Sequence, residues 1–155
     1  MILSEKMTFK QKIHLHYLQL ASGKVQHLQQ VLADLKESGS NETKSTAGDK
    51  HETALAMLQI EQEQKREQLK EAQIQKAALE KIDATISAPI IVNGSLIKTN
   101  KGYLFMSVPL GKAVIDGVTV IALSSQSPLG RQLMGLAVGS NAVFNNNDYI
   151  IENIE

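Results

Sequence analysis

The side chains best suited to chemistry in this chain are four carboxylates between residues 37 and 52. Glu37, Glu42, Asp49 and Glu52 share this stretch with two lysines, so it is only mildly acidic. Carboxylate oxygens can cap a helix or bind a hard cation such as Mg²⁺. Asp49 precedes Glu52 by three residues, which is the spacing of an N-cap with a capping box. The local pattern therefore favours a helix start near Asp49, and Glu42 is interpreted as a solvated loop charge.

The cysteine and histidine content of the chain predicts no catalytic thiol and no transition-metal site. The chain contains no cysteine, which excludes disulfides, thiol catalysis and cysteine-ligated zinc. Its four histidines include no pair spaced i, i+4 on a helix face. A transition-metal site is therefore not expected.

The charge of the chain is balanced throughout, and the formal net charge is zero. Residues 1–85 carry twelve basic and twelve acidic side chains, and residues 86–155 carry four of each. Binding to nucleic acid dominated by phosphate neutralisation is therefore not expected. No apolar stretch approaches the roughly 20 residues that a membrane helix needs. We expect a cytoplasmic protein without a membrane anchor.

The elements that position the carboxylates change in character near Pro89. All three prolines and seven of the ten glycines lie from Pro89 onward. Residues 1–85 are rich in strong helix formers, whereas residues 86–155 are rich in strand and turn formers. These features predict an α+β protein in which an N-terminal helical segment precedes a small β-rich domain.

Two apolar stripes with steps of three and four predict an antiparallel coiled-coil hairpin over residues 1–85. The first stripe is Phe9, Ile13, Tyr17, Ala21, Val25, Leu28, Leu32 and Leu35; the second is Leu55, Leu58, Gln62, Lys65, Leu69, Ala72, Lys76 and Leu79. Folding the stripes together about Ser45 places Leu28 opposite Gln62 and Val25 opposite Lys65. Gly39 is the predicted stop of the first helix. The tip of the hairpin is expected at about residues 38–50.

The second half reads as strands around one short helix. Strands are predicted at 90–99 (interrupted), 103–108, 114–123, 138–144 and 149–154. Asp116-Gly117 is predicted to form a turn or a bulge within the third strand, and Asn145-Asn146-Asn147 to form the turn of a final hairpin. The short helix is predicted at 128–134, with Ser127 as its N-cap and Pro128 at its first position. Residues 83–88 are expected to act as a hinge between the two halves.

The run from Ser127 to Gly135 (Ser-Pro-Leu-Gly-Arg-Gln-Leu-Met-Gly), followed by Val138-Gly139 and a closing Tyr149-Ile150-Ile151, resembles the C-terminal domain of bacterial Gre transcription elongation factors. That family carries a Ser-Pro-Leu-Gly-Arg-Ala-Leu-Leu-Gly-like run and then a terminal hairpin. The order of a helical hairpin and an FKBP-like β domain is also similar. The resemblance implies a coiled-coil hairpin at 1–85 and a Gre C-terminal-like, FKBP-like domain at 86–155.

The resemblance also implies a function. Gre factors dock on RNA polymerase and insert their hairpin into its secondary channel, where tip acids help to hold an Mg²⁺ ion for cleavage of backtracked RNA. Transferred to this chain, the tip acids are Glu42, Asp49 and Glu52, with Asp49 and Glu52 as ligands of an Mg²⁺ shared with the polymerase. The polymerase-binding residues are Ser127, Pro128, Leu129, Gly130 and Arg131. The protein itself would be a monomer without enzymatic activity or a cofactor of its own, and its contact with nucleic acid would be indirect.

The sequence departs from the family pattern in two places. The family's tip motif, Asp-Leu-Ser-Glu-Asn-Ala-Glu-Tyr, has no counterpart here, and Ser140 stands where an acid usually follows Val138-Gly139. The nearest alternative is therefore a regulator that occupies the channel without promoting cleavage. Two other hypotheses are a peptidyl-prolyl isomerase or chaperone, suggested by the FKBP-like shape, and a scaffold that dimerises through its coiled coil.

Overall fold

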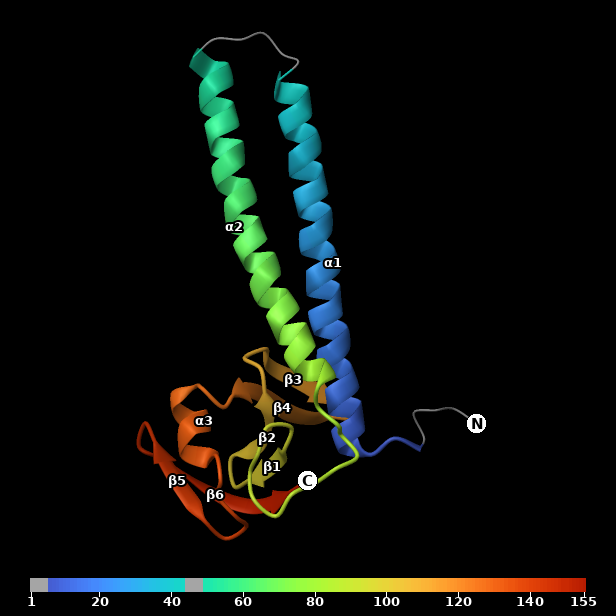
Figure 1. The fold of residues 1–155 in the computed structure, drawn as a ribbon. Helices are drawn as coiled ribbons and strands as arrows, with labels where there is room; N and C mark the ends of the chain where they lie inside the picture. Colours follow the sequence, from blue (N-terminus) through green and yellow to red (C-terminus); the bar gives the residue numbers. More distant parts are fainter. Residues whose placement is uncertain (1–5, 44–48) are drawn as a thin grey trace. The chain divides into compact units, whose positions relative to one another are not determined.

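The protein is an α+β chain in which two helices are followed by a six-stranded mixed sheet and a short helix (Figure 1). The computed structural model describes residues 6–43 and 49–155, and the side chains of 6–39 and 52–155. Its helices are α1 (Phe9–Thr43), α2 (Asp49–Glu80) and α3 (Pro128–Leu133). Its strands are β1 (Leu96–Thr99), β2 (Gly102–Ser107), β3 (Gly111–Ile115), β4 (Val118–Ser124), β5 (Asn141–Phe144) and β6 (Asn147–Ile154).

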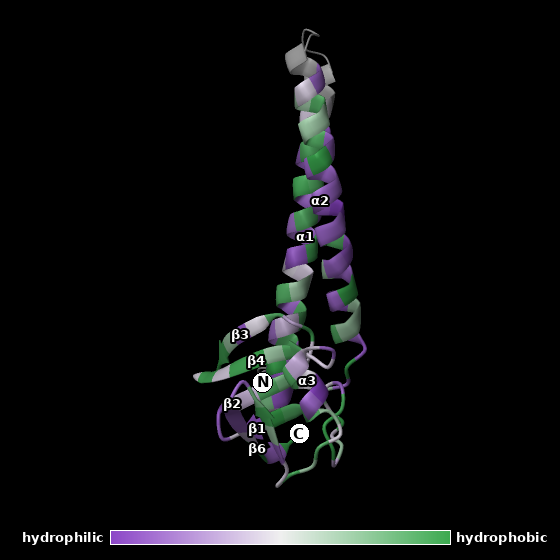
Figure 2. Cartoon of the chain, turned by 90° about the vertical axis from the view of Figure 1, so that its left-hand side faces the viewer, coloured by the Kyte–Doolittle hydropathy of each residue, from purple (hydrophilic) through white to green (hydrophobic). Residues whose placement is uncertain are grey.

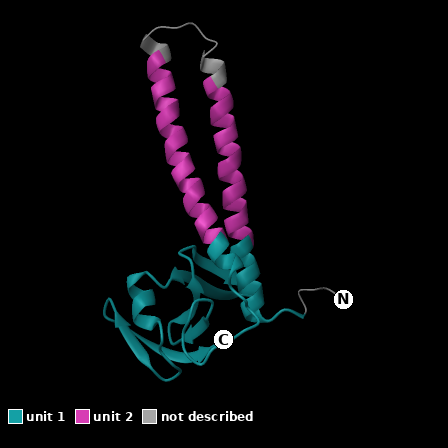
Figure 3. Ribbon diagram, in the orientation of Figure 1, with its two compact units in different colours: residues 1–18, 77–155 teal, residues 19–76 magenta. Residues whose placement is uncertain are grey.

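The chain divides into two compact units whose boundary does not fall at residue 85 (Figure 3). One unit consists of residues 19–76, and the other joins residues 1–18 to residues 77–155. The first turns of α1 and the last turn of α2 therefore belong to the unit that contains the sheet. We call residues 19–76 the helical unit and the remainder the sheet unit.

The helical unit is held by a small apolar cluster. Val25 and Leu28 of α1 are buried together with Ala72 of α2, and Leu69 packs against them. Hydrophilic residues occupy most of the surface of α2, which explains why this core is narrow (Figure 2). A narrow apolar stripe on each of two helices, with polar residues elsewhere, is the pattern that is typical of coiled coils.

The contacts in this cluster differ from the predicted pairing by one heptad. The residues packed with Val25 and Leu28 lie seven positions further along α2 than predicted, at 69 rather than 62 and at 72 rather than 65. Gln62 instead lies near Gly39, where a Cβ would stand 4.0 Å from Gln62 Nε2. The observed alignment brings apolar side chains together, and it leaves Gln62 and Lys65 partly exposed to water.

The prediction that Gly39 ends the first helix is wrong. α1 continues through Gly39 to Thr43, and Gly39 has no positive φ angle of the kind that a glycine helix stop adopts. The predicted tip at 38–50 is therefore helical at both of its described edges. The rest of the tip lies outside the described residues.

The sheet has the strand order β3-β4-β2-β1-β6-β5. Strands β2 and β4 are parallel, and every other neighbouring pair is antiparallel. The segment predicted as one strand at 114–123 is divided between β3 and β4, and the turn predicted as one alternative at Asp116-Gly117 joins them. Both residues have positive φ angles, 53° and 76°, which is the geometry of a tight hairpin turn.

One further strand prediction needs adjustment. Of the strand predicted at 90–99, only Leu96–Thr99 is regular, and Ile90 makes an isolated bridge to Ala137. The predicted terminal hairpin is present as β5 and β6. Its turn places Asn145 and Asn146 at positive φ, a conformation that asparagine tolerates better than most residues.

The apolar core lies between one face of the sheet and α3. It contains buried side chains from β1, β2, β4, β5, β6 and α3: Ile97, Leu104, Met106, Leu123, Leu133, Ala142 and Ile151. Side chains along a strand alternate between faces. Leu104 and Met106 therefore face this core, whereas Phe105 faces the other side of β2.

The first turns of α1 cover that other side. The ring of Tyr17 stacks on Phe105 at a centroid distance of 6.1 Å, and Phe9 meets Tyr103 edge-on at 5.2 Å. The Tyr17 hydroxyl donates to the carbonyl oxygen of Gly111 at 2.7 Å. Phe9 and Tyr17 were predicted to lie in the coiled-coil seam, but they anchor α1 to the sheet instead. This contact explains why three successive residues of β2, Leu104 to Met106, are all buried.

Residues 83–88, which were predicted to act as a hinge, make polar contacts with the rest of the sheet unit. The Lys10 ammonium donates to the carbonyl oxygen of Ile86 at 2.7 Å. Burial lowers the pKa of Lys10, and the nearby Glu155 and Asp83 carboxylates partly offset that effect. Hydrogen bonds from the Thr85 side chain and backbone lower the pKa of Asp83. The segment that follows α2 is thus held against the first turn of α1.

The Tyr17 hydroxyl provides a test of this anchor. Tyr17→Phe should lower the free energy of unfolding by about 1 kcal/mol, because it removes a buried hydrogen bond and keeps the ring. Burial raises the pKa of Tyr17 above its ordinary 10.0, so this residue ionises first in the unfolded chain. Its stabilising effect is present below pH 10.0 and is lost as the pH rises through the raised pKa.

Urea unfolding of the wild type and of Tyr17→Phe over a series of alkaline pH values measures both effects. The difference in free energy of unfolding should be constant below about pH 9 and should shrink above about pH 10. A difference that grows with pH would contradict the anchor, because contributions from other groups cancel between the two proteins.

Candidate functional site: an apolar pocket beside α3

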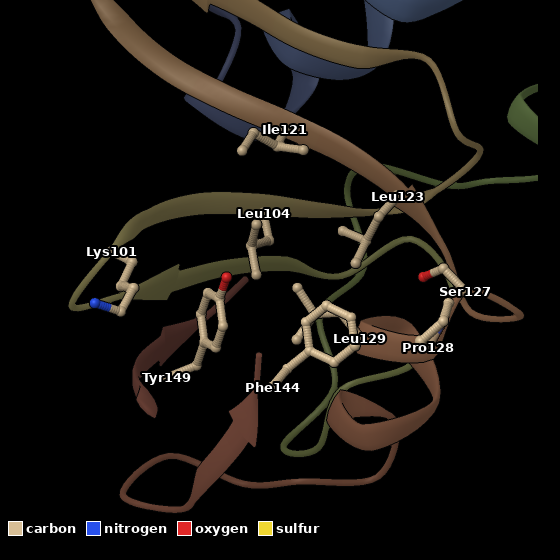
Figure 4. A pocket seen from close by; sticks show the side chains of 9 residues that line it. All are labelled: Lys101, Leu104, Ile121, Leu123, Ser127, Pro128, Leu129, Phe144 and Tyr149. Carbon is tan, nitrogen blue, oxygen red and sulfur yellow. The ribbon is translucent and has the colours of Figure 1, made fainter. Parts of the chain in front are cut away.

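The candidate site is a cavity of about 240 Å³ on the core face of the sheet unit (Figure 4). Most of its walls are apolar side chains from β2, β4, α3 and the β5–β6 hairpin. The lining residues are Lys101, Leu104, Ile121, Leu123, Ser127, Pro128, Leu129, Phe144 and Tyr149. Lys101 is the only one of them that carries a charge.

The start of α3 forms one end of the pocket, and the local sequence fixes it there. Ser127 is the N-cap, as predicted: its hydroxyl accepts from the Gly130 backbone N–H at 3.0 Å and donates to the Ser124 carbonyl at 2.6 Å. Pro128 occupies the first turn, where its missing N–H costs no hydrogen bond. Gly130 is buried against the end of β4, and a Cβ at this position would overlap the Ser124 carbonyl oxygen.

The opposite end of the pocket is set by a clamp between the β1–β2 turn and β6. The Asn100 side chain donates to the Asp148 carbonyl at 3.0 Å and accepts from the Ile150 N–H at 2.7 Å. These two bonds lie on either side of Tyr149, so they hold the turn that carries Lys101 beside the Tyr149 ring. Figure 4 shows Lys101 and Tyr149 at one end of the pocket and Ser127 and Pro128 at the other.

The structure brings together three of the five residues predicted to bind a partner. Ser127, Pro128 and Leu129 line the pocket. Gly130 is buried beneath them, and Arg131 is exposed but does not line the cavity. Sequence reasoning did not identify the residues that complete the pocket from other elements. The alternation along β4 could have suggested Ile121 and Leu123, since they share a face, but the Asn100 clamp has no such sequence signal.

The predicted tip acids are placed only in part. Glu42 lies in the last turn of α1 and Asp49 is the first residue of α2, and the side chains of both are outside the described residues. Glu52 is exposed to solvent on α2. In the described part of the chain, no three His, Asp or Glu side chains gather in a group that could hold a metal ion. The proposed sharing of Mg²⁺ by Asp49 and Glu52 therefore stays a prediction.

Comparison with known proteins gives no further assignment. No protein-family model, no curated protein and no solved structure matches this chain. Within residues 6–43 and 49–155, none of the helices combines the length and apolar character needed to cross a bilayer. The features of the chain that bear on its function are therefore the pocket, the helices and the sequence motif at α3.

Proposed function

We propose that this protein is a Gre-like regulator of transcription elongation. In this proposal the sheet unit, with an FKBP-like topology, docks on RNA polymerase through the α3 end of the pocket. Helices α1 and α2 form an antiparallel coiled-coil hairpin that enters the secondary channel. The protein acts in the cytoplasm as a monomer and stimulates the polymerase's own cleavage of RNA.

The observation that carries the proposal is the position of the Gre-like motif in the fold. The motif residues Ser127, Pro128 and Leu129 form a wall of an open apolar pocket, and Leu129 also packs against the core. The fixed backbone of the capped α3 presents them without a further ordering cost on binding. A motif that served only to start a helix would need the cap but not the pocket.

The helices support the second half of the proposal. Residues 19–43 and 49–76, at about 1.5 Å per residue, give helical segments roughly 40 Å long. A narrow apolar seam with polar outer faces suits a rod that enters a water-filled passage. By resemblance, Asp49 and Glu52 would supply carboxylate oxygens to an Mg²⁺ ion that activates water for transcript hydrolysis. Glu52 is exposed and can present its oxygens in this way.

The proposal is tested with a backtracked elongation complex of bacterial RNA polymerase that carries end-labelled RNA. Addition of the full-length protein should bind the complex and shorten the RNA from its 3′ end. Binding with no cleavage would favour the channel-occupying alternative, which the missing family tip motif supports. Absence of binding at micromolar protein would overturn both.

A further inference from the structure

We propose that the pocket beside α3 recognises a segment of its protein partner in which one large apolar side chain lies next to a carboxylate. The apolar side chain fills the cavity, and Lys101 together with the Tyr149 hydroxyl binds the carboxylate. This inference rests on the proposed function, because RNA polymerase is taken as the partner. It adds the chemistry of the recognised segment and two recognition residues that lie outside the α3 motif.

The volume of the pocket favours a single side chain over a small-molecule ligand. At about 240 Å³, it is smaller than the roughly 300–1,000 Å³ typical of sites for drug-sized ligands. It is larger than the ~150 Å³ cavity that is sufficient to bind benzene. Leu104, Leu123 and Leu129 give it an apolar interior, so water is readily displaced by a large aliphatic or aromatic group.

The polar groups of the pocket determine what must lie beside that side chain. The Ser127 hydroxyl is fully used by its bonds to Ser124 and Gly130. The Tyr149 hydroxyl makes no hydrogen bond within the part of the chain that the structure describes, and it points into the pocket (Figure 4). Lys101 is exposed at the same end and pairs with no acid there, as judged from the described residues.

Lys101 and Tyr149 line the same end of the pocket, so an ammonium donor on a long, flexible side chain and a hydroxyl donor are both available there to a negatively charged acceptor. The Asn100 clamp holds the turn that precedes Lys101 against the backbone on both sides of Tyr149, because its bonds go to residues 148 and 150. None of the lining residues is acidic, so a partner carboxylate meets attraction without repulsion from the wall. Hydrogen bonds to a charged group are stronger than neutral ones. The geometry therefore selects a carboxylate over a neutral amide or a second cation.

The test measures binding of the full-length protein to immobilised bacterial RNA polymerase core enzyme by biolayer interferometry at low and moderate salt. Lys101→Glu should weaken binding roughly tenfold at low salt and should lose most of the salt dependence. Tyr149→Phe keeps the ring and should weaken binding roughly threefold. Thermal melting of each variant verifies that the fold is retained.

Lys98→Glu is the matched control, since it makes the same change of charge on an exposed strand residue. Lys98 pairs with Tyr103 in the sheet, whereas pocket-lining Leu104 pairs with Ile97, so Lys98 faces the side of the sheet away from the pocket. This variant should bind as the wild type does. Equal binding by Lys101→Glu and Lys98→Glu would overturn the inference while the proposed function stands. Failure of the wild-type protein to bind would overturn both.

A photo-crosslinking amino acid in place of Phe144, which lines the pocket, identifies the recognised segment directly. The crosslinked polymerase peptide, sequenced by mass spectrometry, should contain an apolar residue within one helical turn of Asp or Glu. A crosslinked peptide without an acidic residue would contradict the inference.

Discussion

Simultaneous replacement of Glu42, Asp49 and Glu52 by alanine should reduce cleavage of backtracked RNA by about a hundredfold and leave binding to the polymerase unchanged. The expected loss is large because a charged ligand that acts in the transition state typically contributes that much to the rate. Binding is expected to persist because docking is assigned to the pocket, whose residues are not altered. The measurement is the single-turnover rate of transcript shortening at saturating protein.

A matched control removes three exposed carboxylates from α2. Glu61, Glu63 and Glu67 are all exposed and are distant in sequence from the predicted tip. Their combined replacement by alanine changes the net charge equally and should leave the cleavage rate within about twofold of the wild type. Equal rates for the two triple variants, or normal cleavage by the first, would show that the acids near the tip have no catalytic role. Single variants at Glu42 and Asp49 then separate the two positions.

Gly130→Ala should destabilise the sheet unit by about 3 kcal/mol or more and abolish polymerase binding. The added methyl group would overlap the Ser124 carbonyl oxygen. A backbone oxygen cannot swing aside as the end of a long side chain can, so α3 must shift away from β4. That shift displaces Leu129, which lines the pocket, and Leu133, which is fully buried in the core. Chemical denaturation gives the stability, and biolayer interferometry gives the binding.

Gly23→Ala provides the control for this prediction. Gly23 lies within α1, and nothing stands within 4 Å of the position that its Cβ would take. Alanine there should stabilise the helical unit by roughly 0.5–1 kcal/mol, because glycine is the more flexible residue in the unfolded chain. If Gly130→Ala behaved in the same way, the close approach of α3 to β4 would be refuted.

Local signals in the sequence were sufficient to predict the elements that depend on neighbouring residues. Ser127 and Pro128 predicted the start of α3, and the asparagines at 145 and 146 predicted the turn of the last hairpin. The turn depends on the positive φ angles of two residues, and the helix start depends on a hydrogen bond between residues three positions apart. The pocket wall made by α3 follows from the same signals.

Features that depend on contacts between residues far apart in the sequence could not be predicted from local signals. The apolar period in the first helix showed that Phe9 and Tyr17 are buried, but a period does not reveal which element buries them. Their partners, Tyr103 and Phe105, are about ninety residues away in the sequence. The pairing of Val25 with Lys65 was wrong by one heptad because repeats of seven fit the stripe equally well. The end of the pocket at Lys101 depends on Asn100, whose partners are about fifty residues distant.

The docking of the first turns of α1 on the sheet has a practical consequence for truncation. A fragment that begins at residue 86 would leave Phe105 and Val120, both fully buried in the intact chain, open to water. Such a fragment should aggregate or associate through that bare aromatic surface. An autonomous version of the sheet unit would have to bypass residues 19–76 with a short linker, since both flanking pieces of chain belong to it.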